Sequence, residues 1–316
     1  MESSYLGRDY SISVTNADSE EYIFNIECDI QNGFKSHEFL CRLSNYMLYM
    51  KSDSVTIDYQ GVKFIAANLM AVMGCVFQEY TKKDAEHRKV QFINLKKNIF
   101  DAMRRNGFGV HLDARTIPDR YNTVIPYQIF NIEAIELYEK YLTINLFGKD
   151  DIPDTLLAVS DSIKDYLLEL FKNVKDHTTS NYVYTCGQYF PKTHKLYFTI
   201  ADAGETIPYN VSKYHRERNL DMPLKPILWA LTSGNTTSDC HSPRGIGLAL
   251  IKEFIEINQG EIFIVSGDES FELTSRGEVY RKFGNKFNGT FVTLGFNLAE
   301  DKINNILLES SEDIVF

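Results

Sequence analysis

The chain lacks any run of apolar residues that approaches the ~20 needed to cross a membrane as a helix. Its first residues are polar and acidic, whereas a secretory signal is basic and then apolar, so we expect a cytoplasmic protein without a membrane partner. Cysteine is also scarce: there are 5, an odd number, widely spaced and without a C-x-x-C pair. This pattern argues against a disulfide framework and a structural zinc site, and it suits a reducing compartment.

Basic charge is in deficit as well, because 33 Lys and Arg stand against 43 Asp and Glu, for a net charge of -10. A broad surface that neutralises the phosphates of a nucleic acid is therefore not expected. What the chain does have is apolar material. Hydrophobic residues make up 44% of its 316 residues, which is enough for the packed cores of roughly two domains.

The first part of the chain alternates strand-like and helix-like segments. Strands are expected at 22–30, 55–65 and 90–95, and helices at 34–50, 67–83 and 97–109. The resulting βαβα unit ends in the segment 112–128, where two prolines and the loss of helical period predict a domain boundary.

The second part begins with helical patterns and continues with strands and one long polar stretch. The expected helices are 132–147, 155–177 and 245–258, and the expected strands are 181–190, 195–204, 260–266, 270–281 and 289–297. We therefore predict an α/β (α+β) chain whose second domain is a two-layer sandwich, with helices on one face of a mixed sheet. The predicted units are a domain at 1–115, a linker and connecting helix at 116–150, a second domain at 151–300 and a C-terminal tail at 301–316.

Four short elements of the second domain carry residues suited to a nucleotide. A helix places Glu169 and Asn173 four residues apart, hence on one face. A buried-looking strand delivers Asp202 two residues before a glycine, where backbone can approach a flat ring. A glycine-rich turn at 244–248 opens an amphipathic helix whose free N–H groups favour phosphate, and residues 288–290 begin the last strand.

In this order the four elements resemble the N, G1, G2 and G3 boxes of the GHKL ATPase superfamily. That superfamily includes histidine kinases, anti-sigma-factor kinases, gyrase-type topoisomerases and related chaperones. The resemblance covers about residues 155–298, is strongest at 244–267, and implies ATP and Mg²⁺ as ligands. The residues it assigns to the nucleotide are Asn173, Asp202, Gly204, Ile207, Arg244, Gly245, Ile246, Gly247, Leu248 and Thr290. The Walker-A and Rossmann fingerprints are absent from the sequence.

The resemblance also implies a role for each group. Asp202 would accept a hydrogen bond from the adenine amino group, with Gly204 as the close backbone contact and Thr290 near the ring. Asn173 would hold Mg²⁺, and Glu169 would activate water in a hydrolysing member. The glycine-rich turn would cradle the phosphates.

The polar stretch 208–243 between the second and third elements resembles an ATP lid. Candidates for contacts with the phosphates are Lys213, Arg216, Arg218 and Arg244. Cations on a loop are, however, more often simply solvated. A departure from the family pattern lies just before the lid, where Thr206 stands in place of the usual second G1 glycine. This side chain would narrow the pocket or change the lid hinge.

The first domain resembles, over about residues 20–110, a STAS domain, which is the fold of anti-sigma-factor antagonists. The resemblance rests on residues 55–77, which read as a strand, a loop and a helix that starts with small residues. A generic α/β module would give a similar pattern, and both readings stay open. Switch members of the family carry a phosphorylated hydroxyl at that helix start, whereas this chain has Ala66, Ala67 and Asn68.

Residues Ser36-His37-Glu38 resemble the phosphoacceptor box of a histidine kinase. In that class the acceptor lies on a two-helix hairpin just before the catalytic domain, whereas strand-like segments intervene here. We therefore expect His37 to be a helix residue without a phosphoryl-transfer role.

These patterns favour a Mg-ATP-binding, slowly hydrolysing regulatory ATPase. Nucleotide would order the lid and thereby control a protein partner, a regulator or effector, in bacterial signalling, stress response or phage defence. One alternative is an anti-sigma-type serine/threonine kinase acting on a separate STAS partner, and another is a non-enzymatic nucleotide-dependent binding module. Hydrolysis is favoured over protein phosphorylation for two reasons. Glu169 matches the position of the base that activates water, and the fused STAS-like domain has no phosphoacceptor hydroxyl. A homodimer is left open.

Overall fold

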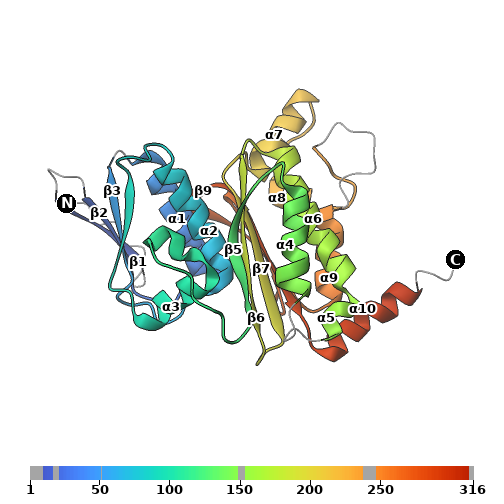
Figure 1. Cartoon of the computed structure of the whole chain (residues 1–316). Helices are drawn as coiled ribbons and strands as arrows, with labels where there is room; N and C mark the ends of the chain where they lie inside the picture. The colour runs from blue at the N-terminus through green and yellow to red at the C-terminus, as the bar shows by residue number, and fades with distance from the viewer. Residues whose placement is uncertain (1–9, 17–20, 51, 149–153, 238–246, 313–316) are drawn as a thin grey trace.

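The computed structural model describes residues 10–16, 21–50, 52–148, 154–237 and 247–312. It is a mixed α/β structure with two sheets, and the layers follow each other as small sheet, helices, large sheet and helices (Figure 1). Among the helices of the described residues, none combines the length and the apolar character that a bilayer crossing requires.

The small sheet belongs to the first part of the chain and has the strand order β1-β2-β3-β4. Its strands are β1 (Tyr10–Asn16), β2 (Glu21–Ile26), β3 (Ser54–Asp58) and β4 (Lys89–Ile93). The three predicted strands β2, β3 and β4 are parallel, as alternation with helices requires, whereas β1 pairs antiparallel with β2 and was not predicted. The helical elements of this part are α1 (Phe34–Tyr49), η1 (Ala67–Leu69), α2 (Met70–Thr81), α3 (Lys97–Asn106) and η2 (Phe108–Leu112).

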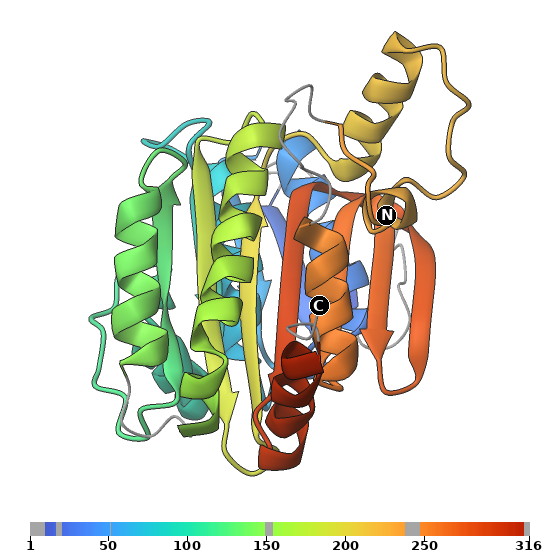
Figure 2. The same cartoon turned by 90° about the vertical axis from the view of Figure 1, so that its right-hand side faces the viewer.

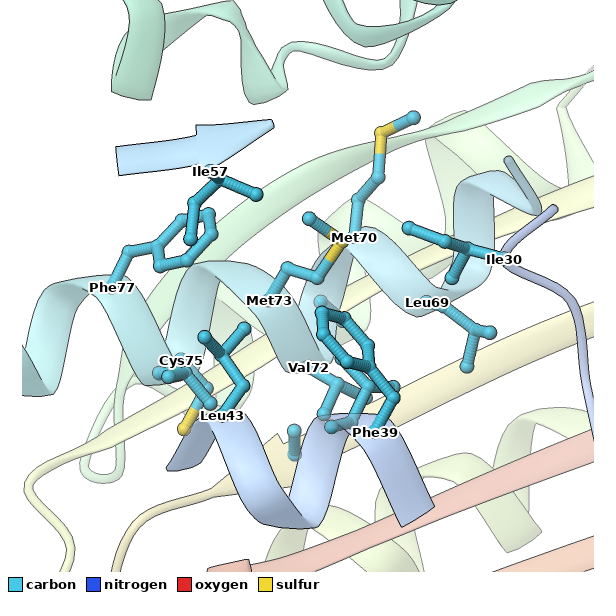
Figure 3. Close-up of a cluster of buried hydrophobic side chains, with 14 of the residues drawn as sticks. Ile30, Phe39, Leu43, Ile57, Leu69, Met70, Val72, Met73, Cys75 and Phe77 are labelled. Atoms are coloured by element: carbon cyan, nitrogen blue, oxygen red, sulfur yellow. The ribbon is translucent and has the colours of Figure 1, made fainter. Parts of the chain in front are cut away.

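The first two turns of helix α2 are apolar and buried on all sides. Every residue from Met70 to Phe77 is buried, whereas a helix at a protein surface keeps a polar face. Figure 3 shows Phe77 of α2 beside Ile57 of β3, with Leu43 of α1 on the other side of the helix. The same cluster includes residues of the large sheet, so the first domain and the large sheet share one core.

The large sheet has the order β5-β6-β7-β9-β8. Its strands are β5 (Val124–Asn131), β6 (Tyr182–Phe190), β7 (Lys195–Asp202), β8 (Glu261–Thr274) and β9 (Gly277–Asn297). Every pairing is antiparallel, so the prediction of a mixed sheet for the second domain is wrong. The predicted strands 260–266, 270–281 and 289–297 all belong to one long hairpin. The chain continues as a strand past Gly267, where the irregularity is a β-bulge, and it turns between Thr274 and Gly277, inside the predicted strand 270–281.

Both faces of the large sheet are covered by helices. Figure 2 shows the face covered by α6 and α9, and helices α1 and α2 lie on the opposite face (Figure 1). The helices of this part are α4 (Ile135–Leu142), a π-helical turn (Thr143–Phe147), α5 (Asp154–Ala158), α6 (Ser160–His177), α7 (Ile207–Glu217), α8 (Pro226–Ala230), α9 (Gly247–Ile257) and α10 (Glu300–Glu312). The predicted two-layer sandwich is thus completed into a larger stack by the first domain.

Two segments that were expected to be irregular contribute to this fold. The predicted linker at 116–150 contains β5, an edge strand in which Pro126 sits within a register irregularity. Proline is tolerated at such a position because no ladder hydrogen bond is required from it. The predicted tail at 301–316 contains most of α10, which buries Ile303 and Ile306 in the second core.

The imidazole of His37 is buried in α1 against the large sheet, with the rings of Phe263 and Phe291 each 5.4 Å from it, edge-on. Burial lowers the pKa of His37 to about 3, so the ring is neutral. Its Nε2 accepts a hydrogen bond from the Gly33 N–H at 3.4 Å. The side chain is therefore closed to a phosphoryl donor, in line with the structural role predicted for it.

Candidate functional site

A cavity of about 820 Å³ opens between α6, the end of β7, the α7–α8 segment and the start of α9. This volume lies within the range of cofactor and ligand sites. Its lining draws on all four elements that the sequence marked for a nucleotide. The candidate residues that line it are Glu169, Asn173, Asp202, Ile207, Gly247, Leu248 and Thr290.

The other candidates are placed differently. Gly204 faces a second cavity on the far side of the β7–α7 loop, and a Cβ built on it would lie 2.7 Å from the Ser180 nitrogen. Its lack of a side chain therefore serves close packing of the loop on the end of α6. Arg244, Gly245 and Ile246 fall outside the described residues. The lid cations Lys213, Arg216 and Arg218 do not line the cavity, and the guanidinium of Arg218 lies 4.0 Å over the ring of Tyr214.

Asp202 is the most unusual group of the site. It ends β7 with only 2% of its surface exposed, and its Oδ1 accepts a hydrogen bond from the Gly204 N–H at 3.0 Å. No cation pairs with it in the described part of the chain. Burial raises the pKa of Asp202 to about 8. A buried carboxyl group without a charge partner, at the wall of a cavity, costs stability and is typical of a functional site.

The backbone around Thr290 is held directly against Asp202. Gly289 has φ +149°, and a Cβ on it would lie 2.0 Å from the Asp202 carbonyl oxygen, so only glycine fits. The Thr290 hydroxyl is 2.6 Å from Oγ of Ser266, and Ser266 Oγ also accepts a bond from the Ile207 N–H at 2.8 Å. Three strands and the lid base therefore meet at this point. Ser266 was missed because a serine in an apolar strand carries no local signal of a site.

Glu169 lies half-buried on α6, against the first residue of α9. A Cβ on Gly247 would be 2.5 Å from Oε1 of Glu169, so glycine is required there while the carboxylate keeps this position. The N-terminal end of α9 carries partial positive charge, which stabilises an adjacent carboxylate. Helix α6 thereby aims Glu169 at the glycine-rich turn that the sequence identified.

Asn173 follows one turn later on the same wall of the cavity. No cluster of three or more His, Cys, Asp or Glu suited to a metal ion occurs among the described residues. A cation at Asn173 would therefore take most of its oxygen ligands from phosphate and water, which is how Mg²⁺ usually binds with nucleotides.

The lid base is tied to α6 by groups that the sequence did not mark. The Asn210 Nδ2 donates a hydrogen bond to the His177 carbonyl oxygen at 2.6 Å, and the Thr237 Oγ1 is 3.4 Å from the His177 Nδ1. Trp229 of α8 also lines the cavity and packs edge-on against His215, with ring centroids 5.0 Å apart. The sole tryptophan of the chain thus lies at the wall of the candidate site.

Comparison with known proteins adds no further likeness. No protein-family model matches the chain, and no curated protein matches it. The function has to be argued from the geometry of this site.

Asn173→Ala is expected to remove the effect of Mg²⁺ on nucleotide affinity, because its carboxamide oxygen is a suitable donor for this cation on the α6 wall of the cavity, one turn from Glu169. Titrations of ATP with Mg²⁺ and with EDTA should differ for the wild type and coincide for the variant. Lys175→Ala, an exposed residue of α6 outside the cavity lining, is the matched control and should keep the wild-type difference. An equal response of both variants would place the ion elsewhere.

Proposed function

We propose that this cavity binds ATP with Mg²⁺ and that the chain is a slowly hydrolysing regulatory ATPase of the GHKL type. The observation that carries the proposal is the position of Asp202. Its buried carboxyl group, which has no cation as a partner among the described residues, lines an 820 Å³ cavity, and Glu169 and Asn173 line the wall on α6. An adenine amino group would add a hydrogen-bond donor to those that the backbone already supplies.

The base end of the cavity suits a flat heterocycle. Ile200 and Val292, which pair with each other two residues before Asp202 and two residues after Thr290, line it with apolar surface, and Asp202 provides the polar contact. A carboxylate accepts a hydrogen bond from the amino group of adenine, but guanine presents a keto oxygen in the corresponding position. The site therefore discriminates between these bases by leaving a buried acceptor unpaired with the wrong one.

The phosphate end suits a magnesium nucleotide better than a bare triphosphate. Among the described lining residues of the cavity, acidic side chains outnumber basic ones. The only Lys or Arg is Lys172, and the acidic residues are Asp165, Glu169, Asp176, Asp202 and Glu205. A bound Mg²⁺ would neutralise phosphate charge beside Asn173. The N–H groups at the start of α9 would contact phosphate oxygens, and Glu169 would accept the proton of an attacking water.

The lid is placed to transmit nucleotide binding to a partner. Helix α7 projects from the body beyond the end of the large sheet (Figures 1 and 2), and its base is bonded to α6 through Asn210. Phosphate contacts that order the lid would alter this projecting surface, which is a mechanism of conformational switching. We propose a protein partner for it in bacterial signalling, stress response or defence.

The first domain supports regulation over kinase activity. Ala66 and Ala67 are buried, and the Asn68 Nδ2 donates a hydrogen bond to the Thr199 Oγ1 of β7 at 3.0 Å. The STAS-like helix start is therefore docked against the large sheet and closed to a phosphoryl donor. A kinase of the anti-sigma type would need a separate STAS substrate, and this fused module would serve as a fixed regulator of the nucleotide domain.

The proposal is tested by the fluorescence of Trp229, the one tryptophan in the chain. Mg-ATP should change its emission saturably, because the indole lines the cavity and lies on α8 within the lid segment. GTP should have at least a tenfold weaker effect. Equal responses to ATP and GTP, or no response together with no heat of ATP binding, would contradict an adenine site.

A further inference from the structure

A groove of about 420 Å³ lies at the opposite end of the large sheet from the nucleotide cavity. It is formed by the loop after β3, by α3, and by the facing ends of β5 and β6. Phe190 at this end pairs with Lys195, the first residue of β7, whereas Asp202 is the last. The two cavities are thus about 24 Å apart along the strand.

The charge of the groove is opposite to that of the chain. Its charged lining residues are Lys63, Arg105 and Lys192, and none of the described lining residues is Asp or Glu. In a chain of net charge -10, this is a local concentration of positive charge. The carboxylate of Asp101, on the same helix as Arg105, forms an ion pair with Arg104 at 3.7 Å. Arg105 itself has no acidic partner among the described residues.

The rim of the groove carries aromatic rings. Phe64 is 39% exposed and Tyr121 70% exposed, and Phe190 lies 6.5 Å from Phe64 between ring centroids, at an interplanar angle of 54°. Large exposed aromatic side chains gathered at one hollow are uncommon on a protein surface unless they bind something. The floor is apolar, with Ile65 and Val124 both buried.

From the three cations and the aromatic rim, we infer that this groove binds a free nucleoside monophosphate. Lys63, Arg105 and Lys192 supply positive charge for a phosphate dianion, and Arg105 can form a bidentate contact with it. The rings of Phe64 and Tyr121 offer faces on which a base can stack. The volume is about half that of the nucleotide cavity, which suits a monophosphate without a metal ion.

The inference is independent of the proposed ATP site, and the experiment separates the two. Thymidine 5′-monophosphate is the probe, because thymine lacks the amino group that Asp202 would recognise. Calorimetry on the full chain should give the same affinity for the wild type and for Asp202→Asn. Binding that is lost in Asp202→Asn would overturn the inference, since the probe would then occupy the first cavity.

The groove itself is tested by variants of its cations. Arg105→Gln and the double variant Lys63→Gln/Lys192→Gln should each weaken the probe at least tenfold. Lys97→Gln, an exposed residue of α3 outside the lining, is the matched control and should leave the affinity unchanged. No binding at millimolar probe, or equal affinity in all of these variants, would overturn the site.

The class of ligand is tested with a probe that lacks the base and with a variant that lacks the aromatic ring of Phe64. Phe64→Ala should weaken thymidine monophosphate about tenfold and leave ribose 5-phosphate unaffected, because only the former has a base to stack. Equal affinities of the wild type for these two compounds would overturn the assignment to a nucleotide. If an oligothymidylate bound tenfold more tightly than thymidine monophosphate, the ligand would be a nucleic-acid strand, and the assignment to a free nucleoside monophosphate would be overturned.

Discussion

Glu169→Gln should slow phosphate release by about 10²–10⁴-fold and leave ATP affinity nearly unchanged. A general base acts on the attacking water in the transition state, so its loss lowers the rate of hydrolysis more than ground-state binding. Glutamine has the shape of glutamate and can keep its place against Gly247, where a Cβ would lie 2.5 Å from Oε1. The substitution therefore removes the proton acceptor with little repacking.

The measurement is single-turnover phosphate release, with ATP affinity read from Trp229. Asp165→Asn is the matched control, because this carboxylate lines the same cavity from α6 one turn earlier and is exposed. It should keep a rate within a fewfold of wild type. A variant at position 169 with the full rate would make Glu169 a structural residue. A wild type that releases no phosphate would favour the binding-module or the kinase alternative.

Measured at pH 9, where the Asp202 carboxyl group is ionised, Asp202→Asn should weaken ATP by about 1.5–3 kcal/mol, the worth of a hydrogen bond to a charged group, which is roughly 10- to 150-fold in affinity. The amide can still accept the Gly204 N–H bond, now 3.0 Å from Oδ1, so the loop should keep its conformation. Calorimetry with ATP checks this expectation. An unchanged affinity would remove Asp202 from the base site.

The same substitution should stabilise the nucleotide-free protein at alkaline pH. Burial raises the pKa of Asp202 to about 8, well above the usual range of a carboxyl group, so folding favours its protonated form. The free energy of unfolding therefore has its full value, as far as this group is concerned, below pH ~4. Between pH ~4 and about 8 it falls by up to about 1.4 kcal/mol per pH unit. Asparagine does not titrate, and its advantage over aspartate should grow across that range.

Urea unfolding of the nucleotide-free proteins at pH 6 and pH 9 measures this difference. The midpoint of Asp202→Asn should exceed that of wild type more at pH 9 than at pH 6. Asp165→Asn, on the exposed side of α6, should run parallel to wild type. If the difference in midpoint between Asp202→Asn and wild type were the same at both pH values, the carboxyl group of Asp202 in the wild type would ionise freely in the folded chain. Weaker ATP binding together with higher stability would mark a residue retained for function.

Local spacing was sufficient to identify most of the candidate site. Glu169 and Asn173 lie four residues apart on one helix, and Asp202, the last residue of β7, pairs with Thr290 within β9. Such features depend on helical period and strand alternation, which short windows of sequence carry. Ser266 could not be found in this way, because its role comes from bonds to Ile207 and Thr290, which are distant in the chain.

The sequence by itself determined the α/β class, most of the helices and several of the residues that line the candidate cavity, because each follows from periodicity or from a glycine at a turn. Tertiary structure alone decided that β5 joins the large sheet despite Pro126 and that β8 and β9 form one continuous hairpin. It also decided that α1 and α2 cover the second face of that sheet. Strand pairing and helix docking depend on which distant apolar surfaces exclude water together, and a local pattern does not encode that choice.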